Sequence, residues 1–140
     1  MRARHERIRV GSAMEEGLNP DERRRRLREE PVIGVETLDG GIVVRLGGEL
    51  DLYNADKVRG ALLEAAKQAP ERLVLDLAEV EFIDSTILGA LIEARASLPE
   101  RRGLLIAAPA HETRRALQVS GLDRHLPVHE TVEDALAAQV

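Results

Sequence analysis

Three consecutive polar residues, Asp84, Ser85 and Thr86, stand where a strand pattern changes into a helical one. The apolar run 73–75 before them is typical of a strand buried on both faces. A serine hydroxyl at the start of a helix lies beside backbone N–H groups that have no partner within the helix, and this arrangement suits an anion such as a phosphoryl group. The apolar residues that follow repeat with helical spacing: Ile87, Leu88, Leu91 and Ile92.

The same three residue types also cap helices without doing any chemistry. Asp, Ser and Thr side chains accept hydrogen bonds from the first backbone N–H groups of a helix. On spacing alone, this structural role is the more common one. The pattern therefore indicates Ser85 as a candidate for modification, and it leaves open whether these residues carry that chemistry or only cap the helix.

The rest of the chain offers little for catalysis or metal binding. It has no cysteine, and it contains none of the usual nucleophile, phosphate-loop, dinucleotide or zinc-protease motifs. His125 and His129 are four residues apart, but Pro127 between them breaks any helix that would align them as metal ligands. We expect no catalytic residue, metal or cofactor, and we interpret Ser85 as the substrate of another enzyme.

Strands and helices alternate in the segment that must position Ser85. Asp39-Gly40 predicts a tight hairpin between strands at 32–38 and 42–46. The later order of strand and helix predicts an α/β fold, with one mostly parallel mixed sheet of about four to five strands and about four helices. The remaining expected elements are strands at 73–77 and 104–107, a brief strand within 125–129, and helices at 55–69, 85–98, 111–120 and 132–138.

Capping residues mark several of the expected helix ends. Asn54 is the expected N-cap of the helix that follows it, which Pro70 ends. Thr131 begins a capping-box pattern before the last helix, and Gly121 is placed to close the helix before it.

Two polar motifs lie at the exits of predicted strands. Parallel sheets gather their sites at the carboxyl ends of the strands. Gly48-Glu49-Leu50-Asp51 and Asp84-Ser85-Thr86 both occupy such positions. We therefore expect the two motifs to be neighbours on one rim of the sheet.

Charge divides the chain into two parts. Residues 1–31 hold nine arginines and seven acidic residues, whereas residues 32–140 carry a net charge of −7. The first part has almost no apolar spacing and is expected to be a mostly disordered tail, with at most a helical turn after Asn19. Its arginine run 23–26 is either a solvated charge run, the more common case, or a basic arm for an acidic partner.

The second part, 32–140, is expected to form one domain. Its acidic charge is poorly suited to nucleic acid. No apolar run approaches the roughly 20 residues that a membrane-spanning helix needs, and no signal peptide is recognisable. We expect a cytoplasmic protein without membrane or direct nucleic-acid contacts.

Residues 81–89, EFIDSTILG, resemble the signature of the STAS domains of bacterial anti-sigma factor antagonists, in which the serine directly after the aspartate is phosphorylated. The motif at 48–51 resembles the one that ends the second strand of that family, and 120–122 resembles its late helix-ending motif. The resemblance runs from Val32 to the C-terminus. The chain departs from the pattern at Ile87, where the family usually has a smaller and more flexible glycine.

The resemblance implies a partner switch controlled by phosphorylation. The unmodified protein binds an anti-sigma factor, which is itself a serine kinase, and so frees a sigma factor for transcription. Phosphorylation of Ser85, with Thr86 as a secondary candidate, releases the partner, and a metal-dependent PP2C-type phosphatase restores the protein. Asp84 is expected to help position the Ser85 hydroxyl. The implied partner-binding residues are Glu49, Asp51, Asp84, Ser85, Thr86 and Ile87.

A second function is compatible with the same resemblance. STAS modules also serve, without phosphorylation, as structural or regulatory subunits of lipid-transport ATPases or stress-sensing complexes. Ile87 in place of glycine leaves this alternative open.

Overall fold

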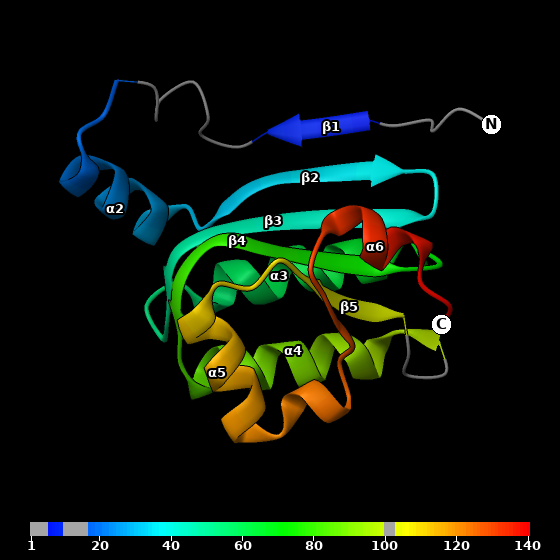
Figure 1. Cartoon of the computed structure of the whole chain (residues 1–140). Coiled ribbons are helices and arrows are strands. Elements are labelled where there is room, and N and C mark those ends of the chain that lie inside the picture. Colours follow the sequence, from blue (N-terminus) through cyan, green and yellow to red (C-terminus); the bar gives the residue numbers. More distant parts are fainter. Residues whose placement is uncertain (1–5, 10–16, 100–102) are drawn as a thin grey trace.

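The computed structural model describes residues 6–9, 17–99 and 103–140, and its strands form one sheet in spatial order β1-β2-β3-β4-β5-β6 (Figure 1). The β1–β2 and β2–β3 pairs are antiparallel, and the three remaining pairs are parallel. The predicted α/β class and hairpin-opened mixed sheet are therefore confirmed. The strands are β1 (Glu6–Arg9), β2 (Val32–Leu38), β3 (Gly41–Leu50), β4 (Leu73–Ile83), β5 (Leu104–Ala107) and β6 (Val128–His129).

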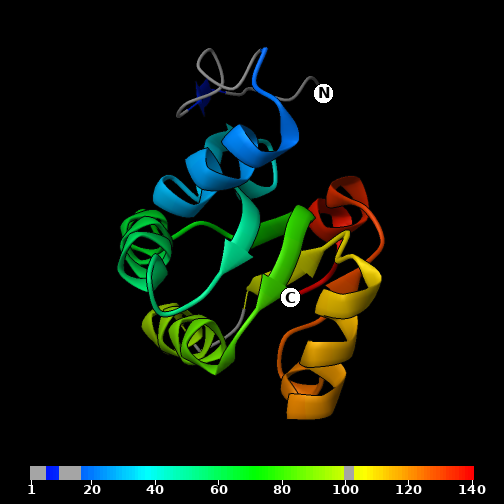
Figure 2. The ribbon, with the colours of Figure 1, turned by 90° about the vertical axis from the view of Figure 1, so that its left-hand side faces the viewer.

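Helices cover both faces of this sheet. Figure 2 shows α3 and α4 side by side on one face, and α6 packs on β5 and β4 from the other. In the described part of the chain the helices are α2 (Pro20–Glu29), α3 (Ala55–Ala66), α4 (Ser85–Ser97), α5 (His111–Ser120), the 3₁₀ turn η2 (Leu122–Arg124) and α6 (Val132–Ala137).

The core consists of aliphatic side chains from both faces of the inner strands. Val44 belongs to the large cluster beneath α3 and α4, whereas its neighbour Val43 belongs to the smaller cluster beneath α6. Burial on both faces explains why these strands read as continuous apolar runs. The only two aromatic residues, Tyr53 and Phe82, are both exposed.

Strands β3 and β4 both continue further than their apolar runs predicted. We expected them to end at residues 46 and 77, but they pair in parallel as far as Leu50 and Ile83. The extra residues include glycines and charged residues and therefore read as loops, because much of what stabilises each extension is its pairing with the other. Two register shifts accommodate the irregular pairing. The consequence is that both motif-bearing strand exits lie side by side.

Two of the expected caps are confirmed, and the third is confirmed in position but not in its side-chain bond. Thr131 accepts a hydrogen bond from the N–H of Asp134 at 3.0 Å, and Gly121 closes α5 with a φ of 78°. Asn54 occupies the N-cap position of α3, but its side chain makes no capping bond. The Asn54 side chain is instead buried, donating to two backbone oxygens and accepting from the backbone N–H of Asp51.

The structure differs from the expected tail over residues 20–29, which form helix α2. Asn19 and Glu22 make a reciprocal capping box, and Pro20 occupies the first turn. Leu27 is the one buried residue of this helix, so the sequence shows no amphipathic stripe that would predict it. Strand β1 also lies within the expected tail. For residues 1–5 and 10–16 the expectation of disorder lies outside the described residues.

Leu27 holds α2 against the part of β3 that β2 does not pair. The N–H of Gly47 donates to the Pro31 oxygen at 2.9 Å, and Leu27 packs on Gly47 and Gly48. Burying a leucine side chain contributes about 1.5–3 kcal/mol. Gly48 has a φ of +80°, and a Cβ added there would lie 2.8 Å from the Leu27 Cβ. Glycine is therefore required at position 48 for both conformation and space.

Gly48→Ala should destabilise the protein by about 1–3 kcal/mol, because it combines a strained backbone with a clash against α2. Gly60→Ala is the matched control, since Gly60 lies in α3 with no atom within 4 Å of an added Cβ. It should stabilise the protein by about 0.5–1 kcal/mol through the higher helix propensity of alanine. Urea unfolding of the two variants measures both values; equal effects would contradict the packing of Leu27 on Gly48.

Candidate functional site

The two polar motifs meet at the carboxyl ends of β3 and β4, as predicted. Leu50 pairs with Ile83, and the N–H of Asp84 donates to the Leu50 oxygen at 3.2 Å. Figure 2 looks onto this end of the sheet. We call this surface the rim, and it consists of Glu49, Asp51, Leu52, Tyr53, Phe82, Asp84, Ser85 and Thr86.

Asp84 joins the loop after β3 to the start of α4. One carboxylate oxygen accepts from the N–H groups of Thr86 at 3.0 Å and Ile87 at 3.2 Å, and the other accepts from the N–H of Leu52 at 3.2 Å. These contacts make Asp84 the N-cap of α4. They also differ from the expected role, because the carboxylate makes no hydrogen bond to the Ser85 hydroxyl.

Ser85 is exposed, and its hydroxyl forms no hydrogen bond within the described residues. The neighbouring Thr86 is exposed as well. Because Asp84 already accepts from the N–H groups of Thr86 and Ile87, those groups are not available to neutralise a phosphoryl group on Ser85. The hydroxyl is therefore open to modification, and an added charge would remain on the surface.

Ile87 does not belong to the rim, contrary to the expected partner-binding set. Its side chain is 1% exposed and packs in the main core, so it cannot contact a docked protein. The helical phase places Ile87 inward and Ser85 outward, although the two residues are only two positions apart. The replacement of the usual glycine by Ile87 therefore changes the packing of the core and not the exposed surface.

Glu49 and Asp51 lie on the rim, where both pair with an arginine that sequence reasoning did not connect to them. Arg28 of α2 lies 3.1 Å from a carboxylate oxygen of Asp51 and 3.6 Å from one of Glu49. The other Asp51 oxygen accepts from the N–H of Tyr53 at 3.0 Å. No sequence signal could have revealed the Arg28 contacts, because they depend on a helix that was not predicted.

Large apolar side chains are also exposed on the rim. Leu52 is 76% exposed, Tyr53 64% and Phe82 50%, and Phe82 lies opposite Glu49 in the strand pairing. A group of exposed apolar side chains beside charged ones is typical of a protein-binding surface. Sequence reasoning missed Leu52 and Tyr53, although an apolar pair directly after Asp51 in an expected loop was a usable signal.

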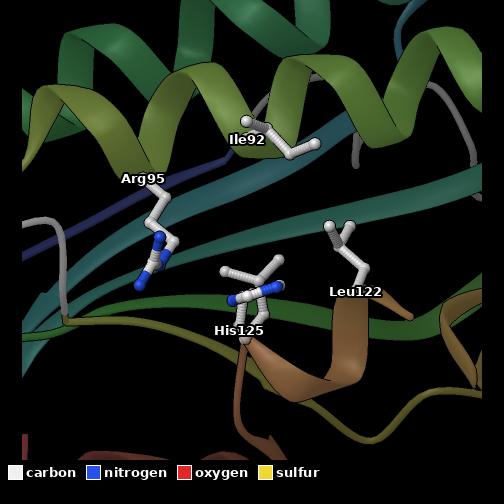
Figure 3. Close-up of a pocket in the computed structure, with 5 residues that line it drawn as sticks. Ile92, Arg95, Leu122 and His125 are labelled. Carbon is white, nitrogen blue, oxygen red and sulfur yellow. The ribbon is translucent and has the colours of Figure 1, made fainter. Parts of the chain in front are cut away.

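A separate groove lies between α4 and η2, and Ser85 is not among the residues that line it (Figure 3). Its volume of about 270 Å³ is slightly below the range usual for small-molecule sites. Ile92, which belongs to the apolar repeat of helical spacing, is 53% exposed at this groove because the buried face of α4 is formed by other residues. Those residues are Ile87, Ala90, Leu91 and Ala94.

Arg45, Glu36 and Asp76 form a second charged cluster, which is structural. The Arg45 guanidinium contacts Glu36 at 2.6 Å and Asp76 at 3.1 Å. Burial by itself lowers the pKa of Arg45, but the hydrogen bonds and charges of the two carboxylates outweigh burial and raise the pKa. These three strand residues compensate one another's charge.

In the described part of the chain, no group of three or more His, Cys, Asp or Glu side chains is arranged to hold a metal ion. None of the described helices is long and apolar enough to cross a membrane.

Several proteins with a similar sequence are named anti-sigma factor antagonists. The model of the family described as STAS domain matches residues 33–135. The anti-sigma-F factor antagonist RsfB of Mycobacterium tuberculosis is 33% identical over 98 residues, which are 70% of this chain and 80% of that protein.

Two solved structures extend the similarity to the fold. An anti-sigma factor antagonist from Mycobacterium paratuberculosis has a TM-score of 0.68 and 35% identity, over 73% of this chain and 87% of that one. The phosphorylated form of the Bacillus cell fate determinant SpoIIAA has a TM-score of 0.52 and 27% identity, over 68% of this chain and 86% of that one.

Asp84→Ala should cost more stability than an ordinary cap, because it leaves three backbone N–H groups in two elements without their acceptor. We expect a loss of about 2–3 kcal/mol. Thr131→Ala is the control; its hydroxyl accepts from one N–H group, and its loss should cost about 1 kcal/mol. Denaturant unfolding compares the free energies of unfolding of the two variants. Equal losses would show that the hydrogen bond from Leu52 to Asp84 does not stabilise the protein.

Proposed function

The chain belongs to the STAS domain family of anti-sigma factor antagonists, and on that premise we propose that it is a protein-binding switch controlled by phosphorylation. The unphosphorylated protein binds an anti-sigma factor that is a serine kinase, and so frees a sigma factor. Phosphorylation of Ser85 releases the partner, and a PP2C-type phosphatase reverses the modification. The observation that carries the proposal is the exposed Ser85 hydroxyl, without a hydrogen bond, inside a rim of exposed apolar side chains.

The position of Ser85 favours a change in binding over a change in fold. Phosphorylation adds about −1.5 to −2 charges and three acceptor oxygens. The α4 dipole favours that charge by about 0.3–1 kcal/mol, while the Asp84 carboxylate next to it opposes the charge. The two local effects are similar in size and opposite in sign, so the free domain should keep its structure.

The effect on a docked partner is larger. A partner that covers the rim removes water from Ser85, and an unpaired charge buried in that way costs several kcal/mol. Asp84 cannot compensate a phosphoryl group, since it carries the same sign of charge and already accepts from the nearest N–H groups. Release of the partner follows from this uncompensated charge.

The named relatives support this reading. RsfB is an anti-sigma-F factor antagonist, and SpoIIAA is a relative with a phosphorylated form. The alternative of an unphosphorylated structural subunit rested on Ile87, whose side chain lies in the core and leaves the outer face unaltered. We therefore favour the switch, acting in the cytoplasm and without catalytic activity of its own.

Incubation with its anti-sigma factor kinase and ATP should place one phosphoryl group on Ser85, because that hydroxyl is exposed at the rim. Mass spectrometry of the digested protein locates the group. Ser85→Ala should abolish the modification, whereas Thr86→Ala should retain it. Modification that persists in Ser85→Ala would assign the acceptor to another residue.

Ser85→Asp should weaken binding of the anti-sigma factor at least about tenfold, or about 1.4 kcal/mol, because it places a charge on the covered surface. Ser85→Ala should bind as tightly as the unmodified protein. Gln118→Glu on the exposed face of α5 adds a similar charge away from the rim and should leave the affinity unchanged. Calorimetric titration gives the three affinities; wild-type affinity in Ser85→Asp would argue against the switch.

A further inference from the structure

Helix α2 lies outside the family match, which begins at residue 33, yet its last turn contacts the rim. Arg28 pairs with Asp51 and Glu49, and its guanidinium carbon lies 4.9 Å from the centre of the Tyr53 ring. One side chain thus engages both carboxylates and the aromatic ring. A cation over an aromatic face and beside two carboxylates is well placed electrostatically.

The backbone of the same turn is also held by the loop and helix that follow β3. The Arg28 oxygen accepts from the buried Asn54 amide at 3.1 Å, and the Glu29 oxygen accepts from the Lys57 ammonium group. These bonds satisfy carbonyl groups that a helix end leaves without partners. The Asn54 amide also donates to the Glu49 oxygen at 2.9 Å, so it ties the end of α2 to the rim itself.

The remaining contacts of α2 are of the kind that open readily. Arg23 and Arg24 pair with Glu79 and Glu81 on β4, and these pairs are about half exposed. Exposed ion pairs are weak and are screened by salt, and a ten-residue helix is marginal on its own. Leu27 is the single buried apolar anchor of the helix. Such a segment belongs to the part of a fold that opens first.

We propose that α2 is an autoinhibitory clasp, whose Arg28 engages Glu49, Asp51 and the Tyr53 ring and must leave them before an anti-sigma factor docks on the rim. This inference rests on the proposed function. The apparent affinity is the intrinsic affinity multiplied by the fraction of molecules in which the clasp is open. It therefore adds a second control to the rim, independent of Ser85.

The charge of the rim explains why a basic helix suits this role. Without α2, Glu49, Asp51 and Asp84 present three carboxylates around exposed apolar side chains. Arg28 neutralises two of them and lies over the Tyr53 ring. A partner that uses these groups competes with Arg28 for the same atoms, so binding and clasp closure exclude one another.

Arg28→Gln should bind the unphosphorylated anti-sigma factor at least about threefold more tightly than wild type, because it removes the contacts that cover the rim. Arg25→Gln is the matched control, since Arg25 lies on the same helix, is exposed and makes no ion pair within the described residues. It should bind like wild type. Calorimetry measures affinity, and stopped-flow mixing should show faster association for Arg28→Gln.

Tyr53 reports clasp opening without any partner. It is the only tyrosine, and the chain has no tryptophan. Acrylamide should quench its fluorescence more strongly in Arg28→Gln and in Leu27→Ala, which removes the buried anchor, than in wild type or Arg25→Gln. Circular dichroism checks that each variant is folded.

The outcomes separate the clasp from the switch. Tighter binding by Arg28→Gln and Leu27→Ala, with stronger quenching, supports the clasp. If wild type binds the anti-sigma factor and both variants bind it equally tightly or more weakly, the clasp is overturned. Weaker binding by the variants would mean that α2 contributes to the docking surface. If no variant binds the anti-sigma factor, the proposed function fails and the clasp fails with it.

Discussion

The rim depends on one carboxylate that serves two elements. Asp84 accepts from the N–H groups of Thr86 and Ile87 at the start of α4 and from the N–H of Leu52 in the loop after β3. Unpaired N–H groups at a helix start need an acceptor, and here the same acceptor fixes the neighbouring loop. The same carboxylate thereby joins the two strand exits. The Ser85 side chain, immediately after Asp84, is exposed and forms no hydrogen bond within the described residues.

A surface switch is physically reasonable because neighbouring residues have separate roles. Asp84 holds the backbone, Ile87 fills the core, and Ser85 faces water between them. A change at Ser85 can alter the charge of the rim without removing a cap or a core side chain. Free energy then changes mainly in the complex, where the rim is dehydrated, and only slightly in the free domain.

The parts of the fold that follow local patterns could be predicted from the sequence. The hairpin at Asp39-Gly40 and the order of strands and helices from Val32 onward are local in this sense. The meeting of the two polar motifs followed from the rule that parallel strands gather sites at their carboxyl ends. Of helix α2, only a turn after Asn19 could be predicted, because its later turns are held by Leu27 on Gly48 and by Arg28 on the rim.

Asn54 shows the same limit within the site. Its residue type and position predict an N-cap, but tertiary contacts with the Arg28 and Glu49 carbonyl groups determine where the amide points. The extensions of β3 and β4 were missed for a related reason, because each is stabilised by the other. Contacts between segments distant in sequence therefore decide the details of the rim, whereas local patterns decide its location.

In the proposed switch, one surface around Ser85 binds the partner and loses it on phosphorylation while the domain stays intact. Amide hydrogen exchange tests this directly when measured on unphosphorylated and phosphorylated protein, each with and without saturating anti-sigma factor. We predict protection of residues 49–53 and 84–88 by the partner in the unphosphorylated protein only, with unchanged exchange in β3 and β4 of the free forms. Equal protection in both forms, or faster exchange in the strands after phosphorylation, would contradict the account.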